Sequence, residues 1–264
     1  MKNFLIIISF FYFHTIAAQE NSDVQIGDQT WASKNLNVKV FLNGDSIKYV
    51  KSPEEWAKCQ ESGYPAYCYY NNDPENGEKF GAIYNWFAMV DSRGIAPNGY
   101  HVANDTDWSE LNEFLNSEVV NSQNKGISGI KLKTNHSWVN NGADEDTYNL
   151  LILLGGCRMI NGSFQGIGSS TSVWSKSLEF TYSISSALRS NYIYFQANEI
   201  NMLIKDETSR NGHYIRCILG QEMATKKQGL PKTMEQIDNE FINNSEVIDN
   251  SSKKKNRLRF KKKE

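Results

Sequence analysis

Hydrophobic residues in the first part of the chain follow short patterns that predict one β-hairpin and one helix. The segment 24–38, VQIGDQTWASKNLNV, alternates apolar and polar residues around a Gly27-Asp28 turn, which is typical of a hairpin. The segment 52–60, SPEEWAKCQ, has Ser52 in the position of a helix cap, then proline, and a glutamate three residues after the serine. This order is the capping-box signature of a helix start.

Two further helices are predicted from apolar residues that recur at helical spacing. One stripe contains Phe80, Ile83, Tyr84, Phe87 and Val90. The other runs from Trp108 to Val119, behind a cap at Asn104 or Asp105. Both stripes are interpreted as core faces and not as ligand-binding surfaces, because an apolar stripe of this width normally packs against the rest of a domain.

After about residue 125 the pattern changes to short strand candidates separated by polar turns. The segment 149–164, NLLILLGGCRMINGSF, predicts a buried strand, a double glycine and a second apolar stretch that ends at the hairpin dipeptide Asn161-Gly162. The strand candidates that follow are TSVWSKS, FTYSISSAL, NYIYFQ, INMLIK and HYIRCIL. Helices early and strands late predict an α+β domain with an antiparallel sheet.

The two ends of the chain differ from this body in composition. Residues 1–18 combine Lys2 with an apolar run from Phe4 to Phe13 and small residues at the end, which is the pattern of a secretory signal peptide. The run is too short to span a bilayer comfortably, so we expect its removal and an exported protein, secreted or at the cell surface. Residues 220–264 contain few large apolar side chains and end in KKKNRLRFKKKE, which predicts a disordered basic tail.

The formal net charge of −2 is unevenly distributed along the chain. Residues 19–219, the predicted folded domain, carry 16 Lys and Arg against 23 Asp and Glu, whereas residues 220–264 carry 11 against 7. An acidic domain argues against nucleic acid as its partner. The basic tail is expected to stay extended and to attract anionic surfaces, such as phosphorylated lipids or acidic polysaccharide. A solvated end without a partner is the alternative.

Four cysteines remain after removal of the signal peptide, namely Cys59, Cys68, Cys157 and Cys217. Export places them in oxidising surroundings, where disulfides form. Cys59 and Cys68 flank a turn-forming SGYP segment, so a local disulfide between them is the preferred pairing. The other pairings stay open, and so does the alternative in which some cysteines are free and fill the core as small apolar residues.

Familiar catalytic motifs are absent from the sequence. It has no His-x-x-x-His, no Gly-x-Ser-x-Gly and no phosphate-binding glycine loop, and hydrolysis is disfavoured without a nucleophile and a base in a recognisable context. The histidines of the mature chain are His101, His136 and His213. We interpret His101 as a packing or capping residue, and we expect no cofactor.

Two polar segments offer oxygen ligands for calcium. The first has Asn71, Asn72, Asp73 and Glu75, and the second has Asp144, Glu145 and Asp146. Neither has the spacing of an EF-hand. Asn-Asn-Asp-Pro is also a sequence whose side chains satisfy the backbone of a tight turn, so we interpret the first segment, with its flanking aromatic residues, as a structural corner. Calcium at either segment is the alternative.

Six segments in a fixed order resemble one known family. They are IGDQTWASKNLNV, AYCYYNNDPENGEKFGAIYNWFAM, PNGYHVANDTDWSEL, IKLKTNHSW, LLGGCRMINGSFQGIGSSTSVWSKS and IRCIL, between residues 24 and 219. In this order they resemble the Fibrobacter succinogenes major paralogous domain, a module of exported bacterial proteins. The chain departs from the family pattern at Ala103, where proline is usual, and at Cys157, where an aromatic residue is common. The resemblance implies a fold more than it implies a chemistry.

A wider resemblance concerns the segment GYHVANDTDWSEL and the strand that contains Arg216. Both are similar to motifs of formylglycine-generating and sulfatase-modifying enzymes, which implies a C-type-lectin-like fold with two or three early helices, an antiparallel sheet and long loops. Those enzymes are oxidases that need a closely placed pair of reactive cysteines. The later half of this chain has only Cys157 and Cys217, sixty residues apart, which disfavours an oxidase.

Ligand contacts are expected between residues 161 and 212. On the lectin-like fold that the wider resemblance implies, this part forms a surface carried by the rigid sheet, and loops on a rigid scaffold concentrate binding residues. The candidate ligand-binding residues are Tyr182, Arg189, Asn191, Tyr192, Tyr194 and Asn198. Their flat rings and their amide or guanidinium groups suit glycans and protein surfaces alike. In the alternative, residues such as Ile193 and Phe195 face the core and the tyrosines only face water.

The leading hypothesis is therefore an exported, non-enzymatic binding or adhesion module for an extracellular glycan or protein partner. An enzyme related to the formylglycine-generating oxidases is one alternative, and a structural surface component without a small ligand is another. A signal on a glycan array would favour the module, whereas two free thiols within bonding distance would favour the enzyme.

Overall fold

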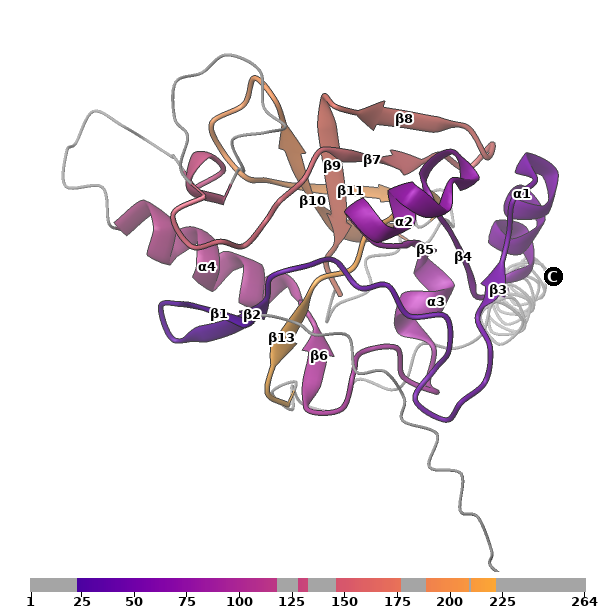
Figure 1. The fold of residues 1–264 in the computed structure, drawn as a ribbon, viewed down its shortest axis with the longest axis horizontal. Coiled ribbons are helices and arrows are strands. Elements are labelled where there is room, and N and C mark those ends of the chain that lie inside the picture. The colour runs from indigo at the N-terminus through magenta and orange to yellow at the C-terminus, as the bar shows by residue number, and fades with distance from the viewer. Residues whose placement is uncertain (1–22, 118–127, 133–145, 177–188, 209, 222–264) are drawn as a thin grey trace, which may run out of the picture.

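The computed structural model describes residues 23–117, 128–132, 146–176, 189–208 and 210–221 (Figure 1). The predicted signal peptide and nearly all of the predicted basic tail lie outside these residues. Within them the chain forms two β-sheets with helices between and beside them, which confirms the predicted α+β class. In this part of the chain no helix has the length and apolar character needed to cross a bilayer.

The smaller sheet joins the two ends of the described chain, and its strand order is β1-β2-β13-β6. Its strands are β1 (Asp23–Ile26), β2 (Gln29–Ala32), β6 (Tyr100–Val102) and β13 (Cys217–Leu219). β1 and β2 form the predicted hairpin, with Gly27 in the left-handed region at a φ of 58°. Since Ile218 of β13 pairs with Trp31 of β2, the last strand closes onto the first hairpin.

The larger sheet has nine strands in the order β11-β10-β9-β7-β12-β5-β4-β3, with β8 paired to β7. They are β3 (Lys48–Tyr49), β4 (Ala66–Cys68), β5 (Ile83–Asn85), β7 (Gly155–Arg158), β8 (Phe164–Ile167), β9 (Ser170–Trp174), β10 (Arg189–Gln196), β11 (Leu203–Thr208) and β12 (Gly212–His213). Most pairs are antiparallel, but β3 with β4 and β7 with β9 are parallel. Single 3-10 turns lie at η1 (Tyr70–Asn72) and η2 (Ile130–Leu132).

The helix predicted at SPEEWAKCQ is α1 (Pro53–Ser62). The predicted cap is confirmed, because Ser52 Oγ accepts the backbone N–H of Glu55 at 3.0 Å. The buried guanidinium of Arg158 fixes the segment that leads into the helix, since it donates to the carbonyl oxygens of residues 50–52 at 2.6 to 3.1 Å. The capped start of α1 is thereby tied to β7.

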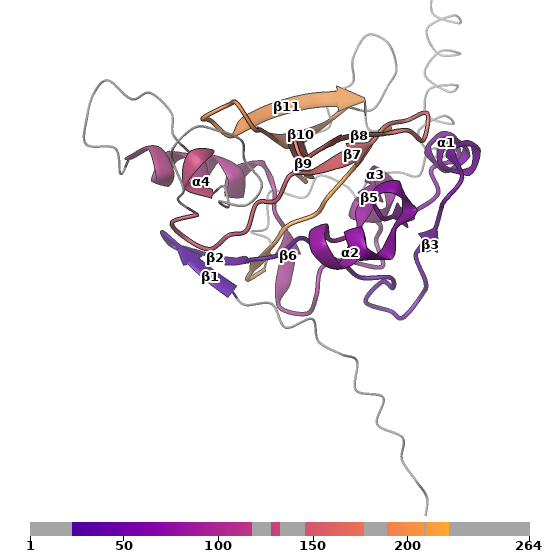
Figure 2. The ribbon, with the colours of Figure 1, turned by 45° about the horizontal axis from the view of Figure 1, so that its top comes forward.

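The helix α4 (Asp105–Ser117) lies between the β1–β2 hairpin and the β10–β11 end of the larger sheet, as Figure 2 shows. It is the helix predicted behind Asn104, whose side chain caps it. On one side the ring of Trp108 lies 4.6 Å from the ring of Trp31 in β2. On the other side the first residue of α4 accepts a hydrogen bond from the Asn191 amide of β10 at 2.9 Å. The helix therefore links the two sheets.

The single helix predicted from Phe80 to Val90 is wrong. The segment contains the end of α2 (Pro74–Phe80), the strand β5 and the short helix α3 (Trp86–Val90). α2 ends at Gly81, which has a φ of 86°. β5 lies between β4 and β12 and all three of its residues are fully buried. A strand that is buried on both faces can carry large nonpolar residues at consecutive positions, as β5 does at Ile83 and Tyr84, and these two residues also satisfied helical spacing.

The strands predicted in the later half are present with shifted bounds. The apolar run at 150–154 is largely buried but precedes the ladder strand, which is β7. The hairpin at Asn161-Gly162 is confirmed, because β7 and β8 pair across it. The candidates TSVWSKS, NYIYFQ and INMLIK correspond to β9, β10 and β11, and HYIRCIL divides into β12 and β13. The candidate FTYSISSAL lies outside the described residues.

None of the four cysteines forms a disulfide in the structure, so the predicted disulfide between Cys59 and Cys68 is absent. Cys59 of α1 and Cys68 of β4 both belong to the main cluster of buried apolar side chains. Cys217 belongs to a second buried cluster around β5 and α3. These thiols fill the core as small apolar groups, which matches the alternative interpretation.

Candidate functional site

In the polar turn before α2, two side chains are hydrogen-bonded to the backbone. Asp73 caps α2, because its Oδ1 accepts the backbone N–H of Glu75 at 3.0 Å. The amide of Asn72 donates to the carbonyl of Lys51 at 3.1 Å. Asn71 and Asn72 have φ values of 53° and 57°, a left-handed conformation that asparagine tolerates better than most residues. The Asn72 amide nitrogen and one Asp73 carboxylate oxygen are thus bonded to the backbone, as a structural corner requires, while Asn72 Oδ1 is buried without a hydrogen-bond partner among the described residues.

The second polar segment is also engaged with the backbone where it is described. Asp146 accepts the N–H groups of Leu150 and Leu151 on its two carboxylate oxygens, each at 2.8 Å. Asp144 and Glu145 lie outside the described residues. Among the residues that the structure places, no group of three or more His, Cys, Asp or Glu side chains could hold a metal ion.

The strand β10 carries four of the six candidate ligand-binding residues, and its side chains alternate between the two faces of the sheet. Ile193 and Phe195 are fully buried on the core face. Tyr192 and Tyr194 lie half-buried on the opposite face. Asn191 shares the core face, where its amide bonds to the start of α4. On this strand the two tyrosines are therefore half-buried on the face opposite the core, and the asparagine is bonded to α4.

Tyr192, Tyr194 and Lys205 form a row of side chains on this partly exposed face, which we name the aromatic row, and the buried His213 lies beneath Tyr192. Tyr192 stacks on the His213 ring with centroids 4.7 Å apart and planes at 13°. It meets Tyr194 edge to face at 6.4 Å. The Nζ atom of Lys205 lies 4.2 Å from the centroid of Tyr194. Two phenol rings and one ammonium group thus lie side by side on β10 and β11.

Of the candidate residues outside the aromatic row, the structure describes the side chains of Asn191 and Asn198. Asn198 is exposed in the turn after β10, while Tyr182 and the side chain of Arg189 lie outside the described residues. Sequence reasoning missed Lys205 and His213 as members of the site. The position of Lys205 depends on the antiparallel pairing of β10 with β11, which places it opposite Tyr192. His213 comes from β12, which is not a paired neighbour of β10.

Ser172 and His213 form a buried pair behind the aromatic row. The Ser172 Oγ lies 2.5 Å from His213 Nδ1, and both residues are only 2% exposed. Trp174 meets the imidazole at 4.3 Å on one side, and Tyr192 covers another. A nucleophile must reach its substrate. Because neither the hydroxyl nor the imidazole is open to solvent, the pair holds the ring in position instead.

Three of the four thiols of this domain have a raised pKa. Burial raises the pKa of Cys68 and of Cys217 to about 12, and it also raises the pKa of Cys59. Reactive thiols need the opposite shift, because the thiolate is the nucleophile and the metal ligand. Cys157 of β7 and Cys217 of β13 also belong to different sheets.

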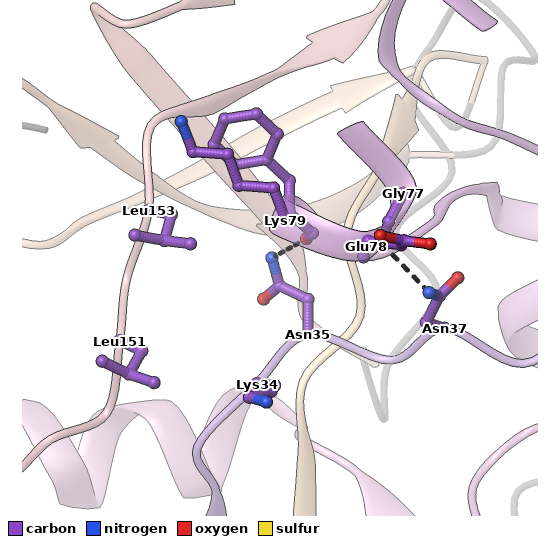
Figure 3. A pocket seen from close by; sticks show the side chains of 10 residues that line it. Lys34, Asn35, Asn37, Gly77, Glu78, Lys79, Leu151 and Leu153 are labelled. Carbon is purple, nitrogen blue, oxygen red and sulfur yellow. Dashed lines mark hydrogen bonds between the residues drawn. The ribbon is translucent and has the colours of Figure 1, made fainter. Parts of the chain in front are cut away.

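A small pocket of about 90 Å³ lies beside the end of α2, and we name it the α2 pocket (Figure 3). Three segments line it: residues 34–37 after β2, residues 77–81 at the end of α2, and Leu151 with Leu153. These segments are distant in sequence, so only the fold brings them together. The lining combines lysine, asparagine and leucine side chains, and it shares no residue with the aromatic row.

One comparison with known families covers most of this domain. The family model described as the Fibrobacter succinogenes major domain matches residues 24–219, a range that includes the helices α1 to α4, the aromatic row and the α2 pocket. No curated protein and no solved structure matches the chain. The resemblance drawn from the six ordered motifs is confirmed, and the chain belongs to the Fibrobacter succinogenes major domain family.

Proposed function

We propose that this domain is an exported, non-enzymatic binding or adhesion module whose ligand is an extracellular glycan or protein. The observation that carries the proposal is the aromatic row, in which two half-buried tyrosine rings and an exposed lysine lie together on one face of the larger sheet. Aromatic faces pack against the C–H groups of sugars and against apolar side chains, while phenol and ammonium groups add hydrogen bonds.

The buried side chains that pack behind Tyr192 favour ligand binding by the aromatic row. Tyr192 rests on the His213 ring, and that ring is held by Ser172 and Trp174. A ligand that stacks on a ring already fixed in place loses less conformational entropy on binding than one that must order a mobile side chain. The buried Ser172–His213 pair thus restrains the position of the Tyr192 ring.

The proposal includes a C-type-lectin-like variant of the α+β fold and a location outside the cell. The fold is supported by the early helices α1 and α4 and by the rigid sheet that carries the aromatic row. The location is supported by the basic start and apolar run of residues 1–18. The oxidase alternative is disfavoured by the raised pKa of three of the thiols.

A glycan array probed with the mature chain, followed by titration calorimetry with the best-bound glycan, tests the proposal. Tyr194→Ala should weaken binding about tenfold, because one stacked ring contributes about 1 kcal/mol or slightly more. Tyr64→Ala is the matched control, since Tyr64 is 56% exposed in the segment after α1, away from the aromatic row. The Tyr64→Ala variant should bind the glycan with the same affinity as the unmodified chain.

Equal affinities of the Tyr194→Ala and Tyr64→Ala variants would exclude the aromatic row as the binding surface. If the array gives no signal and the immobilised chain retains no extracellular protein, the alternative hypothesis is favoured, in which the protein is a structural surface component without a small ligand. A retained protein partner whose binding is lost in Tyr194→Ala would support the module and select a protein ligand.

A further inference from the structure

We propose that Asn98 is a site of spontaneous deamidation, and that its isoaspartate product loosens the closure of the domain by its last strand. The backbone nitrogen of Gly99 attacks the side-chain carbonyl carbon of Asn98, the amide nitrogen leaves as ammonia with the proton of the Gly99 N–H, and a cyclic succinimide forms. Water then opens the ring at either carbonyl and gives aspartate or isoaspartate. No residue of the aromatic row takes part, so the inference is independent of the proposed function.

The reaction is fastest where glycine follows asparagine, because glycine has no side chain to hinder its backbone nitrogen. The sequence has six Asn-Gly dipeptides, whose asparagines are residues 43, 76, 98, 141, 161 and 211. The dipeptide at residue 141 lies outside the described residues. At each of the others, the structure shows whether the side-chain amide and the glycine N–H are free to form the ring.

Asn43 and Asn161 precede glycines in exposed turns, but hydrogen bonds hold their reacting groups. In both turns the glycine N–H donates to the backbone carbonyl three residues earlier, at 2.9 Å after Asn43 and at 2.8 Å after Asn161. In both, the asparagine Oδ1 accepts the backbone N–H two residues later at 3.0 Å. These bonds must open before the succinimide can form, so the folded chain protects both sites.

Asn76 and Asn211 are also held by hydrogen bonds. Asn76 lies in α2, and its amide donates to the Tyr70 carbonyl at 3.1 Å. Asn211 Oδ1 accepts the Ile160 N–H at 2.8 Å, and the glycine that follows it is buried in β12. Ring formation at either site therefore requires the surrounding structure to open.

Asn98 and Gly99 lie in the turn that leads into β6, and both residues are exposed. Among the residues that the structure places, neither the Asn98 side chain nor the Gly99 N–H has a hydrogen-bond partner. Gly99 has a φ of 84°, and the space where a Cβ would lie is open to 4 Å. The turn bond runs from the Tyr100 N–H to the Pro97 carbonyl at 2.9 Å and uses neither reacting group. Both groups are thus available for the reaction.

The product matters because Gly99 takes part in the closure of the domain. Its carbonyl accepts the Gly220 N–H at 2.7 Å, and the next residue, Tyr100 of β6, pairs with Leu219 of β13 (Figure 1). In isoaspartate the main chain passes through the side-chain carbons, so the backbone before Gly99 becomes one carbon longer. The longer backbone displaces the Gly99 carbonyl from Gly220 and weakens the pairing of β6 with β13.

Peptide mapping by mass spectrometry of the mature chain, incubated at pH 8, tests the inference. We expect Asn98 to deamidate about tenfold faster than Asn43 or Asn161, or more, because two hydrogen bonds must open first at each of those sites. The control is the same mapping of the chain unfolded in urea, in which the three sites should react at similar rates. The melting temperature of the folded chain should fall as the fraction of isoaspartate at residue 98 rises.

Two variants separate the longer backbone from the added charge. Asn98→Asp carries the charge of the product on a normal backbone, so before incubation it should melt at the temperature of the unmodified chain. Asn98→Gln would need a larger and slower-forming ring, so its melting temperature should stay steady during the incubation.

Contrary outcomes overturn separate parts of the inference. Equal rates at Asn98, Asn43 and Asn161 in the folded chain, or a faster rate at one of the other two, would show that the hydrogen bonds do not select the site. An unchanged melting temperature in a chain with isoaspartate at residue 98 would show that the closure tolerates the longer backbone. A lowered melting temperature of Asn98→Asp would assign the effect to charge, and an equal fall for Asn98→Gln would place the damage elsewhere.

Discussion

Two fully buried arginines hold irregular segments of this domain in place. Arg158 lies against the rings of Trp56 and Phe164 at 4.6 and 4.9 Å and donates to four backbone carbonyl oxygens. Arg216 donates to the carbonyls of Ala32 and Leu150, and burial lowers its pKa to about 9. Buried backbone carbonyl groups need hydrogen-bond donors. The two guanidinium groups donate to such carbonyl groups.

The buried thiols give a prediction about alkaline pH. Burial raises the pKa of Cys68 and Cys217 from 9.0 to about 12. Above pH 9 the thiols of the unfolded chain ionise while the buried thiols keep their protons, so the unfolded state is favoured and stability is lost as the pH rises from about 9 toward 12. The buried Tyr67, whose pKa is also raised to about 12, acts in the same direction.

Melting temperatures measured by circular dichroism between pH 7 and pH 11 test the predicted loss of stability at alkaline pH. The melting temperature should be steady near pH 8 and should fall above about pH 9. The double variant Cys68→Ala/Cys217→Ala should show a shallower fall, and Cys157→Ala is the control because that thiol is only partly buried. If the melting temperature of the double variant falls with pH as steeply as that of the unmodified chain, these thiols do not contribute to the pH dependence of stability.

At the scale of elements, the start of α4 is joined to the smaller sheet by a reciprocal network. Asn104 Oδ1 accepts the N–H groups of Thr106 and Asp107 at 2.9 and 3.1 Å. Asp107 in turn accepts the Asn104 N–H at 2.8 Å and contacts His101 Nε2 of β6 at 3.0 Å. His101 therefore lies where a packing or capping residue was expected, between a strand and the helix that links the sheets.

The cap gives a prediction for α4. Asn104→Ala removes the acceptor for two helix N–H groups and should lower the free energy of unfolding by about 1 to 2 kcal/mol. Asn104→Ser is the matched control, because serine restores a cap oxygen. Urea unfolding measures both variants, and the alanine variant should have a lower midpoint with an unchanged slope. Alanine and serine variants with the same midpoint would mean that the cap bonds do not stabilise the domain.

At the scale of the whole molecule, the domain is closed by its own last strand. β13 pairs with β2 on one side and β6 on the other, and Gly220 donates its N–H to the Gly99 carbonyl at 2.7 Å. The sequence beyond this closure is rich in lysine and arginine. The boundary predicted at residue 220 thus lies directly after the last described strand, and it stays a prediction.

The tail gives a prediction that concerns residues outside the described part of the chain. Deletion of residues 251–264 removes eight Lys and Arg and should leave the melting temperature unchanged. It should reduce retention on vesicles of anionic phospholipid at low salt. Added salt should weaken retention of the full chain, because exposed charges are screened beyond about 8 Å near physiological ionic strength. A variant of full length with serine at the eight basic positions separates charge from length.

Two outcomes would contradict this expectation. Equal retention of the full, truncated and serine-substituted chains would show that the tail does not contact anionic surfaces. A large fall in melting temperature on deletion would show that the tail packs on the domain and that the predicted boundary at residue 220 is misplaced.

The sequence by itself determined those features that depend on a few neighbouring residues. Ser52 and Asn104 cap α1 and α4 as predicted, because a cap bonds to N–H groups within three residues of itself. Gly27 and Gly162 mark hairpin turns for the same local reason, since each turn requires a positive φ. The six ordered motifs also identified the family, because their order is a property of the sequence alone.

Only the tertiary structure decided the features that join distant segments. The segment at Ile83 became a strand because β4 and β12 lie on its two sides, although its apolar pattern also suited a helix. The stacking of Tyr192 on His213, and the meeting of Lys34 with Leu151 in the α2 pocket, each bring together residues from separate parts of the chain. The free energy of such contacts depends on which surfaces become buried against each other, and a local pattern of residues does not contain that information.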